Sequence, residues 1–148
     1  MVAVVQRVSS AGVSVNNTTV GAIRKGVVVF LGIARGDEEK DADYLSDKIL
    51  NLRIFEDVTG RMNSSLLDIS GEMLVVSQFT LLADCRKGRR PSFAGAAGPE
   101  QASGLYEYFL TQVKRSVRKL AAGRFQAMMK VDLINDGPVT IVLNSKKE

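Results

Sequence analysis

Residues 27–33 form an unbroken apolar run with the sequence Val27-Val28-Val29-Phe30-Leu31-Gly32-Ile33. A strand covered on one face alternates apolar and polar residues, whereas a strand buried on both faces stays apolar throughout. The run therefore predicts a central strand with a packed layer on each side. Short β-branched runs precede it at Val2 to Val8, Val13 to Val15 and Val20 to Ile23, and Asn16-Asn17 suits a hairpin turn between two of them.

Two helices are predicted downstream of this run. Pro99 suits the start of the second helix, because its missing N–H costs nothing there. The apolar face of that helix runs from Ala102 to Leu120, and Gly123 is the residue expected just past its end. Asp37 is expected to cap the first helix. The apolar face of the first helix is marked at spacings of three and four by Ala42, Leu45, Ile49 and Leu52.

The remaining strands complete the expected fold. They are predicted at Ile54-Phe55, Met73 to Phe79, Phe125 to Ile134 and Val139 to Leu143, and the long loop over residues 84–99 is of a length that is usually functional or mobile. This order favours a single α/β domain over residues 1–148, without internal repeats. We expect a three-layer α/β/β sandwich with mixed sheets and helices on one face, rather than a doubly wound fold.

The composition limits the chemistry that is available. The 148 residues include no histidine and one cysteine, Cys85, so an internal disulfide is impossible and a zinc site is nearly excluded. The sequence has no glycine-rich nucleotide-binding motif, no signal-peptide pattern, and no apolar run near the ~20 residues of a membrane span. We therefore expect a cytoplasmic protein without a membrane anchor that uses no metal and no cofactor.

Positive charge is concentrated in two stretches. The net charge is +4, and the acids gather over residues 37–43 instead. One basic stretch is Arg86-Lys87-Gly88-Arg89-Arg90, directly after a candidate site described below. The other has no intervening acid and contains Lys114, Arg115, Arg118, Lys119 and Arg124. Each stretch alone could be a solvated surface, but the two together favour nucleic acid as the partner.

Two short polar segments stand out as a candidate site. Ser77-Gln78-Phe79-Thr80-Leu81 follows an apolar run, where a strand is expected to give way to a loop. Asn135-Asp136-Gly137-Pro138-Val139-Thr140 places a Gly-Pro step before another β-branched run. Neither segment supplies a conventional nucleophile and base, so any catalysis must depend on backbone groups, hydroxyls and the substrate itself.

These two segments resemble the D-aminoacyl-tRNA deacylases, also known as D-tyrosyl-tRNA deacylases. Gln6-Arg7-Val8, Asn51 to Phe55 and Arg86 to Phe93 strengthen the resemblance, which runs from Met1 to about Leu143. It implies a cytoplasmic homodimer with active sites at the subunit interface. It also implies an editing enzyme that hydrolyses the ester of D-aminoacyl-tRNA, or of glycine mischarged on alanine tRNA, with no cofactor and with neither a membrane nor DNA as partner.

The resemblance assigns a role to Gly137 and Pro138. It implies a cis Gly-Pro peptide whose carbonyls reach the partner subunit's pocket, bind the substrate ammonium and exclude an L side chain. Arg7 would help to hold this step. Without the resemblance, a trans peptide in a simple turn and a surface arginine would be the ordinary interpretations.

The resemblance places Ser77, Gln78, Phe79 and Thr80 on the opposite wall of that pocket. Their N–H groups would meet the negative charge that develops on the ester carbonyl. The resemblance implies that the ribose 2′-hydroxyl of the tRNA is used instead of a side-chain base. We therefore assign Thr80 to binding and orientation, with covalent catalysis by Thr80 as the lesser alternative, and a purely structural role for Ser77 stays open.

The resemblance also covers the pocket lining and the basic loop. Phe125 and Met129 fall in the family's pocket-lining stretch, where this chain departs at Gln126 and Met128, although neighbouring methionines are more often core residues. The phosphates of the tRNA would be bound by Arg86, Lys87, Arg89 and Arg90.

Two alternatives to the editing enzyme are also compatible with the sequence. In the first, the chain is a non-catalytic tRNA-binding module whose Ser-Gln-Phe-Thr segment is structural. In the second, Cys85, which stands where relatives often carry threonine, is the nucleophile of a thiol hydrolase. The absence of histidine weighs against the second alternative.

Overall fold

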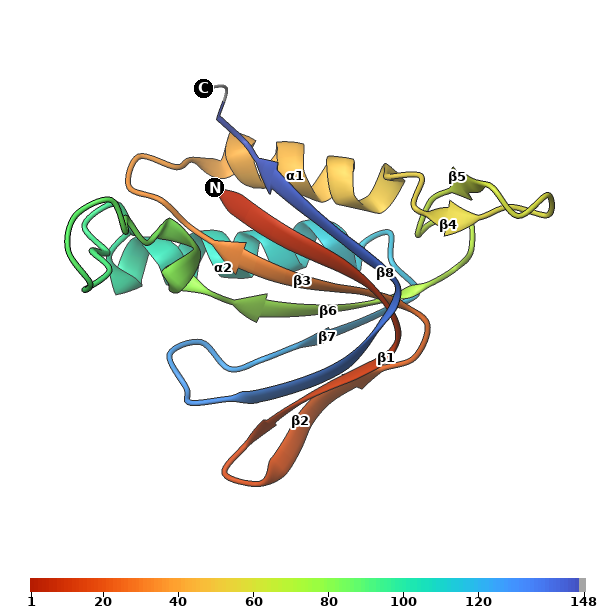
Figure 1. Cartoon of the computed structure of the whole chain (residues 1–148), viewed down its shortest axis with the longest axis horizontal. Coiled ribbons are helices and arrows are strands. Elements are labelled where there is room, and N and C mark those ends of the chain that lie inside the picture. The colour runs from red at the N-terminus through yellow and green to blue at the C-terminus, as the bar shows by residue number, and fades with distance from the viewer. Residues whose placement is uncertain (147–148) are drawn as a thin grey trace.

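The structure is a computed structural model that describes residues 1–146 (Figure 1). Two helices, one 3-10 helix and eight strands follow one another within these residues. In chain order they are β1 (Val2–Val15), β2 (Thr18–Ile23), β3 (Gly26–Gly32), α1 (Glu39–Asn51), β4 (Phe55–Glu56), β5 (Met62–Ser64), β6 (Glu72–Ser77), η1 (Phe79–Leu82), α2 (Pro99–Lys114), β7 (Lys119–Ala122) and β8 (Lys130–Asn144).

A six-stranded mixed sheet organises the molecule, in the order β2-β1-β3-β6-β7 with β8 paired to β1. β3, β6 and β7 are parallel to one another, whereas β1 pairs antiparallel with β2, β3 and β8. The register between β1 and β8 shifts twice around Val8. Both long strands bend there (Figure 1), as strands do at bulges.

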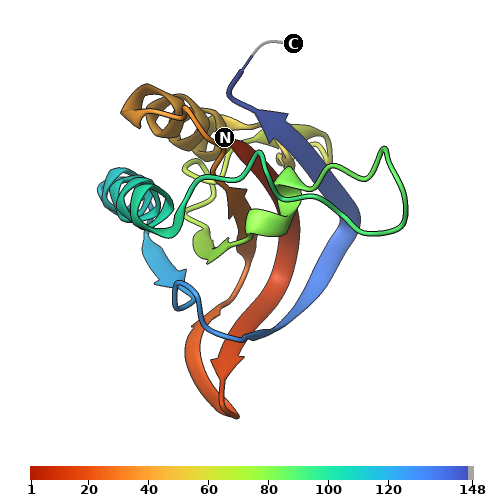
Figure 2. The same ribbon diagram turned by 90° about the vertical axis from the view of Figure 1, so that its left-hand side faces the viewer.

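The sheet is covered on both faces. α1 and α2 lie against one face, while the far arms of β1 and β8, with β2, form a layer on the other (Figures 1 and 2). Of β3, Val27, Val29 and Leu31 point into the core beneath the helices, and Val28 points into a second core that Val131 and Leu133 of β8 help to cover. The prediction of a three-layer α/β/β sandwich with mixed strands and helices on one face is confirmed. Each fully buried side chain of this size contributes roughly 1.5–3 kcal/mol.

In two places, the prediction of two short strands is wrong, because the structure has one long strand instead. β1 runs unbroken through Ser9 and Ser10, and β8 runs unbroken through Gly137 and Pro138. The two strands pair along nearly their whole length, and this tertiary pairing overrides the local breaks in apolar pattern. The Gly-Pro step therefore lies inside a strand, so the interpretation as a simple turn is wrong.

The second helix is shorter than its apolar pattern suggests. α2 ends at Lys114, although Val117 remains buried and Leu120 lies on β7. The parallel pairing of β7 with β6, in which Lys119 faces Glu72, takes these residues out of the helix. Gly123 consequently follows β7 instead of ending the helix. The predicted start of the last strand at Phe125 is wrong, because a turn over residues 125–127 precedes β8, which begins at Lys130.

The cap of the first helix is also displaced by one residue. Glu38, rather than Asp37, is the N-cap of α1, and its N–H donates to the Asp41 carboxylate at 2.8 Å. Asp37 is buried instead, where its carboxylate accepts the N–H of Ala34 and lies 2.7 Å from the ammonium of Met1. Within residues 1–146, no helix is long and apolar enough to cross a membrane.

Candidate active site

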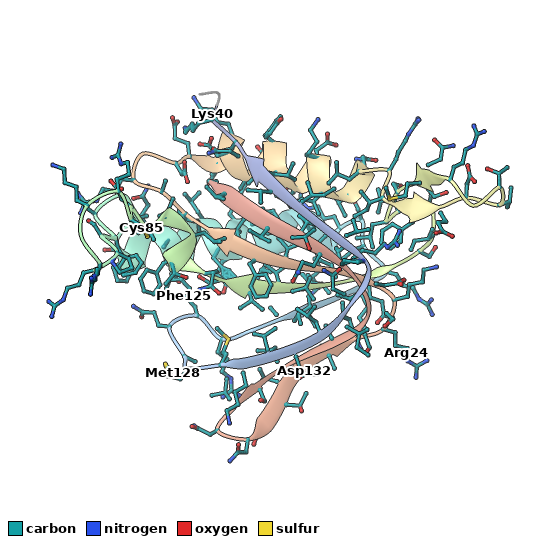
Figure 3. The ribbon with its side chains drawn as sticks, viewed as in Figure 1. Arg24, Lys40, Cys85, Phe125, Met128 and Asp132 are labelled. Carbon is teal, nitrogen blue, oxygen red and sulfur yellow. The ribbon has the colours of Figure 1, made fainter. Side chains whose placement is uncertain are left out.

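A cavity of about 650 Å³ lies where β3 and β6 end. This volume is within the range of sites for small molecules or their covalently attached groups. Phe125 and Met128 lie at this end of the molecule, as does Cys85 (Figure 3). Five residues expected in the site line the cavity, namely Ser77, Gln78, Phe79, Phe125 and Met129.

One wall of the cavity is the step from β6 into η1. The N–H of Gln78 donates to the carbonyl of Leu31 at 2.8 Å, so it belongs to the sheet and is not free for a ligand. The N–H groups of Phe79 and Thr80 have no acceptor within residues 1–146. These two groups begin a 3-10 helix, where N–H groups lack partners within the helix. Phe79 lines the cavity and Thr80 follows directly beside it, so these are the donors available at the edge of this wall.

Thr80 lies beside the cavity without lining it. Its hydroxyl accepts a hydrogen bond from the side-chain amide of Gln78 and is exposed to solvent. An amide is no base, so the contact orients the hydroxyl without activating it. The half-exposed ring of Phe79 meets the Phe93 ring edge-on, with 5.1 Å between the centroids.

The other wall is the segment between β7 and β8. Its Phe125 ring lies 6.0 Å from the ring of Tyr106, which comes from α2 beneath it. The Tyr106 hydroxyl donates to the carbonyl of Val75 at 3.1 Å, the same carbonyl that accepts the Gly123 N–H. Burial raises the pKa of this tyrosine, so the hydroxyl remains a donor. Tyr106 thus ties the second wall to β6, which carries the first.

Gly123 allows Met129 to pack against the backbone of this wall. A Cβ on Gly123 would lie only 2.5 Å from the sulfur of Met129. Gln126 and Met128, the two positions at which this chain departs from the family pattern, lie between Gly123 and Met129. Gln126 has a φ of 62°, and Met128 is 90% exposed. Both methionines line the cavity, and the exposed Met128 does so at its rim.

The Gly137-Pro138 step lies away from this cavity, at the bend of β8. Its peptide bond is cis, and Gly137 has a φ of 137°, which favours glycine. Arg7 is buried beside it and donates from Nε to the carbonyl of Asp136 at 2.9 Å and from Nη1 to the carbonyl of Ile54 at 2.7 Å. The interpretation of Arg7 as a surface arginine is therefore wrong. Among residues 1–146, neither Arg7 nor the Gly-Pro step lines the cavity of its own chain.

The basic loop adjoins the cavity through Phe93. Backbone hydrogen bonds between Asp84 and Ser92 close the loop at its base. Arg86 pairs with Asp84 at 2.7 Å, and its hydrogen bonds lower the pKa of that carboxyl to about 2. The exposed side chains of Lys87, Arg89 and Arg90 form no ion pair within the described part of the chain. Three of the four expected phosphate-binding cations thus have no carboxylate partner, while Arg86 is held by one.

Comparisons with known proteins identify the family of this chain. A family model described as D-Tyr-tRNA(Tyr) deacylase matches residues 4–144. A D-aminoacyl-tRNA deacylase of Syntrophus aciditrophicus is 60% identical over 147 residues, and one of Clostridioides difficile is 58% identical, with 99% of both chains covered in each case. The chain belongs to the D-aminoacyl-tRNA deacylase family. The predicted family is confirmed, and with it the prediction of an enzyme that hydrolyses carboxylic esters.

Solved structures show the same architecture. That of a protein named c-Myc DNA Unwinding Element Binding Protein is 45% identical and has a TM-score of 0.94, covering 99% of this chain and 100% of that one. A probable eukaryotic D-amino acid tRNA deacylase has a TM-score of 0.85 at 17% identity, over 97% of this chain and 98% of that one. The second likeness concerns the fold alone. The deacylase fold thus persists where the sequence has diverged widely.

Sequence reasoning missed two aromatic residues of this candidate site. Phe93 lines the cavity from the end of the basic loop, and Tyr106 supports Phe125 from below. A tyrosine on the apolar face of a helix needs a buried acceptor for its hydroxyl, and that requirement is the signal that could have singled out Tyr106. For Phe93 the sequence offers no comparable signal, because only the closure of the loop brings its ring to Phe79.

Proposed function

We propose that this chain hydrolyses the ester bond of D-aminoacyl-tRNA, and of glycine mischarged on alanine tRNA, while leaving L-aminoacyl-tRNA intact. The observation that carries this proposal is the full-length identity of 60% to a curated D-aminoacyl-tRNA deacylase. The cavity supports it, because its first wall offers backbone donors and no side-chain base. Such a site suits an ester that is already activated.

The proposed reaction begins with the carbonyl oxygen of the ester at the N–H groups of Phe79 and Thr80. Water adds to the carbonyl carbon, the bond from that carbon to the ribose oxygen breaks, and the ribose oxygen takes up the proton. The vicinal 2′-hydroxyl of the ribose assists this step in place of a protein base. One donor to the developing oxyanion is typically worth on the order of 10²–10³ in rate.

The proposed basis of chiral selection is a homodimer. Gly137 and Pro138 of one subunit would form a wall in the pocket of the other, accept the substrate ammonium and leave no space for an L side chain. The position of the step away from its own cavity supports this arrangement, as does its fixation by the buried Arg7. The exposed apolar side chains of Phe79 and Met128 at the cavity rim are also suited to contact with a second copy.

The remaining parts of the proposal concern tRNA and location. Lys87, Arg89 and Arg90, with Arg86 beside them, would bind phosphates of the tRNA next to the ester. We place the enzyme in the cytoplasm, where charged tRNA is used, and with neither a membrane nor DNA as its partner. The name of one similar protein refers to a DNA element, so a test of tRNA binding has to include DNA as a competitor.

Discharge of matched D- and L-tyrosyl-tRNA, with and without EDTA, tests the function. We expect rapid loss of the D ester alone, unaffected by the chelator. Loss of neither ester would favour the non-catalytic tRNA-binding module, and loss of both would refute the chiral wall. Activity that vanishes in Cys85→Ser would instead support the thiol hydrolase.

Gly137→Ala tests the wall separately. A Cβ at this position would lie 2.8 Å from Val139 and 3.1 Å from Arg7, on a backbone with positive φ. We expect the variant to lose turnover or discrimination between D and L esters while its affinity for uncharged tRNA stays near that of the wild type. A variant with unchanged discrimination would remove Gly137 from the proposed mechanism.

A further inference from the structure

A second cationic surface lies at the end of the molecule opposite the cavity. It combines two segments far apart in sequence, the turn between β2 and β3 and the connection from α2 to β7. We call it the end patch and define it as Arg24, Lys25, Arg115, Arg118 and Lys119. Arg24 lies at one end of the molecule, whereas Phe125, Met128 and Cys85 lie at the other (Figure 3).

The sheet register brings these segments together at the start of β6. Glu72 pairs with Gly26 on one side and with Lys119 on the other. Its N–H donates to the carbonyl of Lys25 at 3.0 Å, and its carboxylate accepts the N–H of Arg24 at 2.8 Å. The basic stretch seen in the sequence is thereby divided, because Arg124 follows β7 toward the cavity end, while Arg24 and Lys25 join Arg115, Arg118 and Lys119.

The charge of the end patch is not neutralised by neighbours. All five side chains belong to exposed residues, and none forms an ion pair within residues 1–146. Glu72 is the acid at its centre, and one of its oxygens is already occupied by the backbone of Arg24. Elsewhere, by contrast, Lys40, Arg86 and Lys146 each pair with a carboxylate.

The position of the end patch indicates the size of its partner. A small ester bound in the cavity cannot extend to the opposite end of the same chain. A polyanion long enough to engage both ends, or to reach the end patch of a second subunit, has to be a macromolecule. We propose that the end patch binds the sugar–phosphate backbone of the tRNA body, remote from its aminoacyl end. This inference rests on the proposed function, because it assigns the polyanion as the tRNA whose ester is hydrolysed.

The experiment compares two variants that lose the same charge. The patch variant is Arg115→Gln with Arg118→Gln and Lys119→Gln. The control variant is Lys40→Gln with Lys48→Gln and Arg61→Gln, which removes exposed cations from α1 and the β4–β5 hairpin. Both are assayed with D-tyrosyl-tRNA and with D-tyrosyl-adenosine, a small ester that carries the same ribose but no phosphate backbone. Unfolding in urea verifies that both variants are folded.

We expect the patch variant to raise KM for D-tyrosyl-tRNA by at least about tenfold, with kcat unchanged, because phosphate contacts contribute to binding and not to the chemical step. The slope of log Kd against log salt for uncharged tRNA should fall by about two to three. Hydrolysis of D-tyrosyl-adenosine should be the same in both variants. Equal KM values for D-tyrosyl-tRNA in the two variants would overturn the proposal, as would an equal loss on the small ester.

Two further measurements separate this proposal from others. Binding of uncharged tRNA, followed by fluorescence anisotropy, reports on the end patch even if the wild type hydrolyses neither ester. A failure of the proposed function would therefore leave the test of the patch intact. A DNA duplex of matched length serves as competitor, and equal affinity for DNA with the same dependence on the patch would overturn the assignment to tRNA.

Discussion

Two regions of this molecule, the cavity end and the bend of β8, are held together in different ways. At the cavity end, the walls come from several segments joined by separate contacts, and aromatic and methionine side chains such as Phe79 and Met128 remain exposed at the rim. At the bend of β8, one buried guanidinium, that of Arg7, binds the carbonyls of two segments at once.

This difference matches what each region has to do in the proposed function. A pocket that admits varied side chains tolerates many small contacts, each adjustable on its own. A wall that rejects one enantiomer has to stay fixed, because a shift of the backbone by a fraction of an ångström would open space for the wrong side chain. A single substitution at the bend of β8 should therefore lower the free energy of unfolding strongly. At the cavity end, each substitution should lower it less, because the contacts are shared among many residues.

The largest effect is expected at Arg7. Arg7→Met replaces the guanidinium but keeps an unbranched side chain in its place. Both hydrogen bonds are lost, and the carbonyls of Ile54 and Asp136 are left without this donor. We expect the free energy of unfolding to fall by about 3 kcal/mol, since hydrogen bonds from charged groups are worth about 1.5–3 kcal/mol each. Denaturation in urea measures this change.

Arg35→Met is the matched control for Arg7. Arg35 also donates to a carbonyl, that of Ala96, but at 3.4 Å and on the exposed surface of the cavity end. We expect a loss below about 0.5 kcal/mol there. Similar losses in the two variants would show that the two regions are held equally firmly, and the comparison would fail.

An intermediate effect is expected at Asp41, in the first turn of α1. Burial disfavours the charged carboxyl, but hydrogen bonds from the N–H of Glu38 and from Ser145 and Lys146 outweigh it and lower the pKa to about 2 from 3.8. A carboxyl with a lowered pKa stabilises the folded state above its unfolded pKa and loses that effect as the pH falls. We therefore expect Asp41 to contribute about 2 kcal/mol above pH 5, vanishing as the pH falls from about 4 to 2.

Urea unfolding of wild type and Asp41→Asn across pH 2 to 6 measures this contribution. The two curves should lie apart above pH 5 and converge near pH 2. Glu39→Gln is the control, because it removes a carboxylate from the same helical turn that has no hydrogen-bond partner within residues 1–146. Curves of wild type and Asp41→Asn that stay parallel down to pH 2 would contradict the assignment.

The parts of the fold that followed from sequence are those decided by local pattern. The apolar run at Val27 to Ile33 predicts a strand buried on both faces, and that burial alone requires the third layer. The ends of the helices and strands could not be predicted from the sequence, because pairing between distant segments determines them. β8 extends through Pro138 since β1 pairs with it on both sides of the bend, and α2 stops at Lys114 since β6 pairs with Lys119.

In the candidate site, too, local sequence predicts some features, whereas contacts between distant segments determine the others. The two motifs that contain Ser77 to Thr80 and Gly137-Pro138 could be singled out through their resemblance to the family, because both motifs are contiguous in the sequence. The isomer of the Gly-Pro bond cannot be deduced from residue types, and neither can the burial of Arg7, whose acceptors on Ile54 and Asp136 are 47 and 129 residues away. The end patch likewise exists only through the register that joins Arg24 and Lys119 at Glu72.

The smallest effect is expected at Tyr106, which joins the two walls of the cavity. Tyr106→Phe keeps the ring against Phe125 and removes the hydrogen bond to Val75. The carbonyl of Val75 still accepts the N–H of Gly123 at 3.0 Å, and the carbonyl of Gly123 loses only a long contact of 3.4 Å from the same hydroxyl. We therefore expect a loss of about 1 kcal/mol in the free energy of unfolding. Looser spacing of the walls should raise KM for D-tyrosyl-tRNA about twofold to threefold, equivalent to well under 1 kcal/mol, without a change in kcat.

Tyr108→Phe, two residues further along α2, is the control that gives this small change its meaning. Its hydroxyl donates to Asp43 at 2.7 Å, a shorter contact than that of Tyr106, but one that lies at the surface and away from both walls. If hydrogen-bond length decided the outcome, Tyr108→Phe would be the more damaging variant. If the position between the walls decides it, Tyr108→Phe should cost less than about 0.5 kcal/mol and leave KM unchanged. An equal rise of KM in both variants would mean that the cavity end is one rigid unit, like the bend of β8. The proposed difference between the two regions would then be wrong.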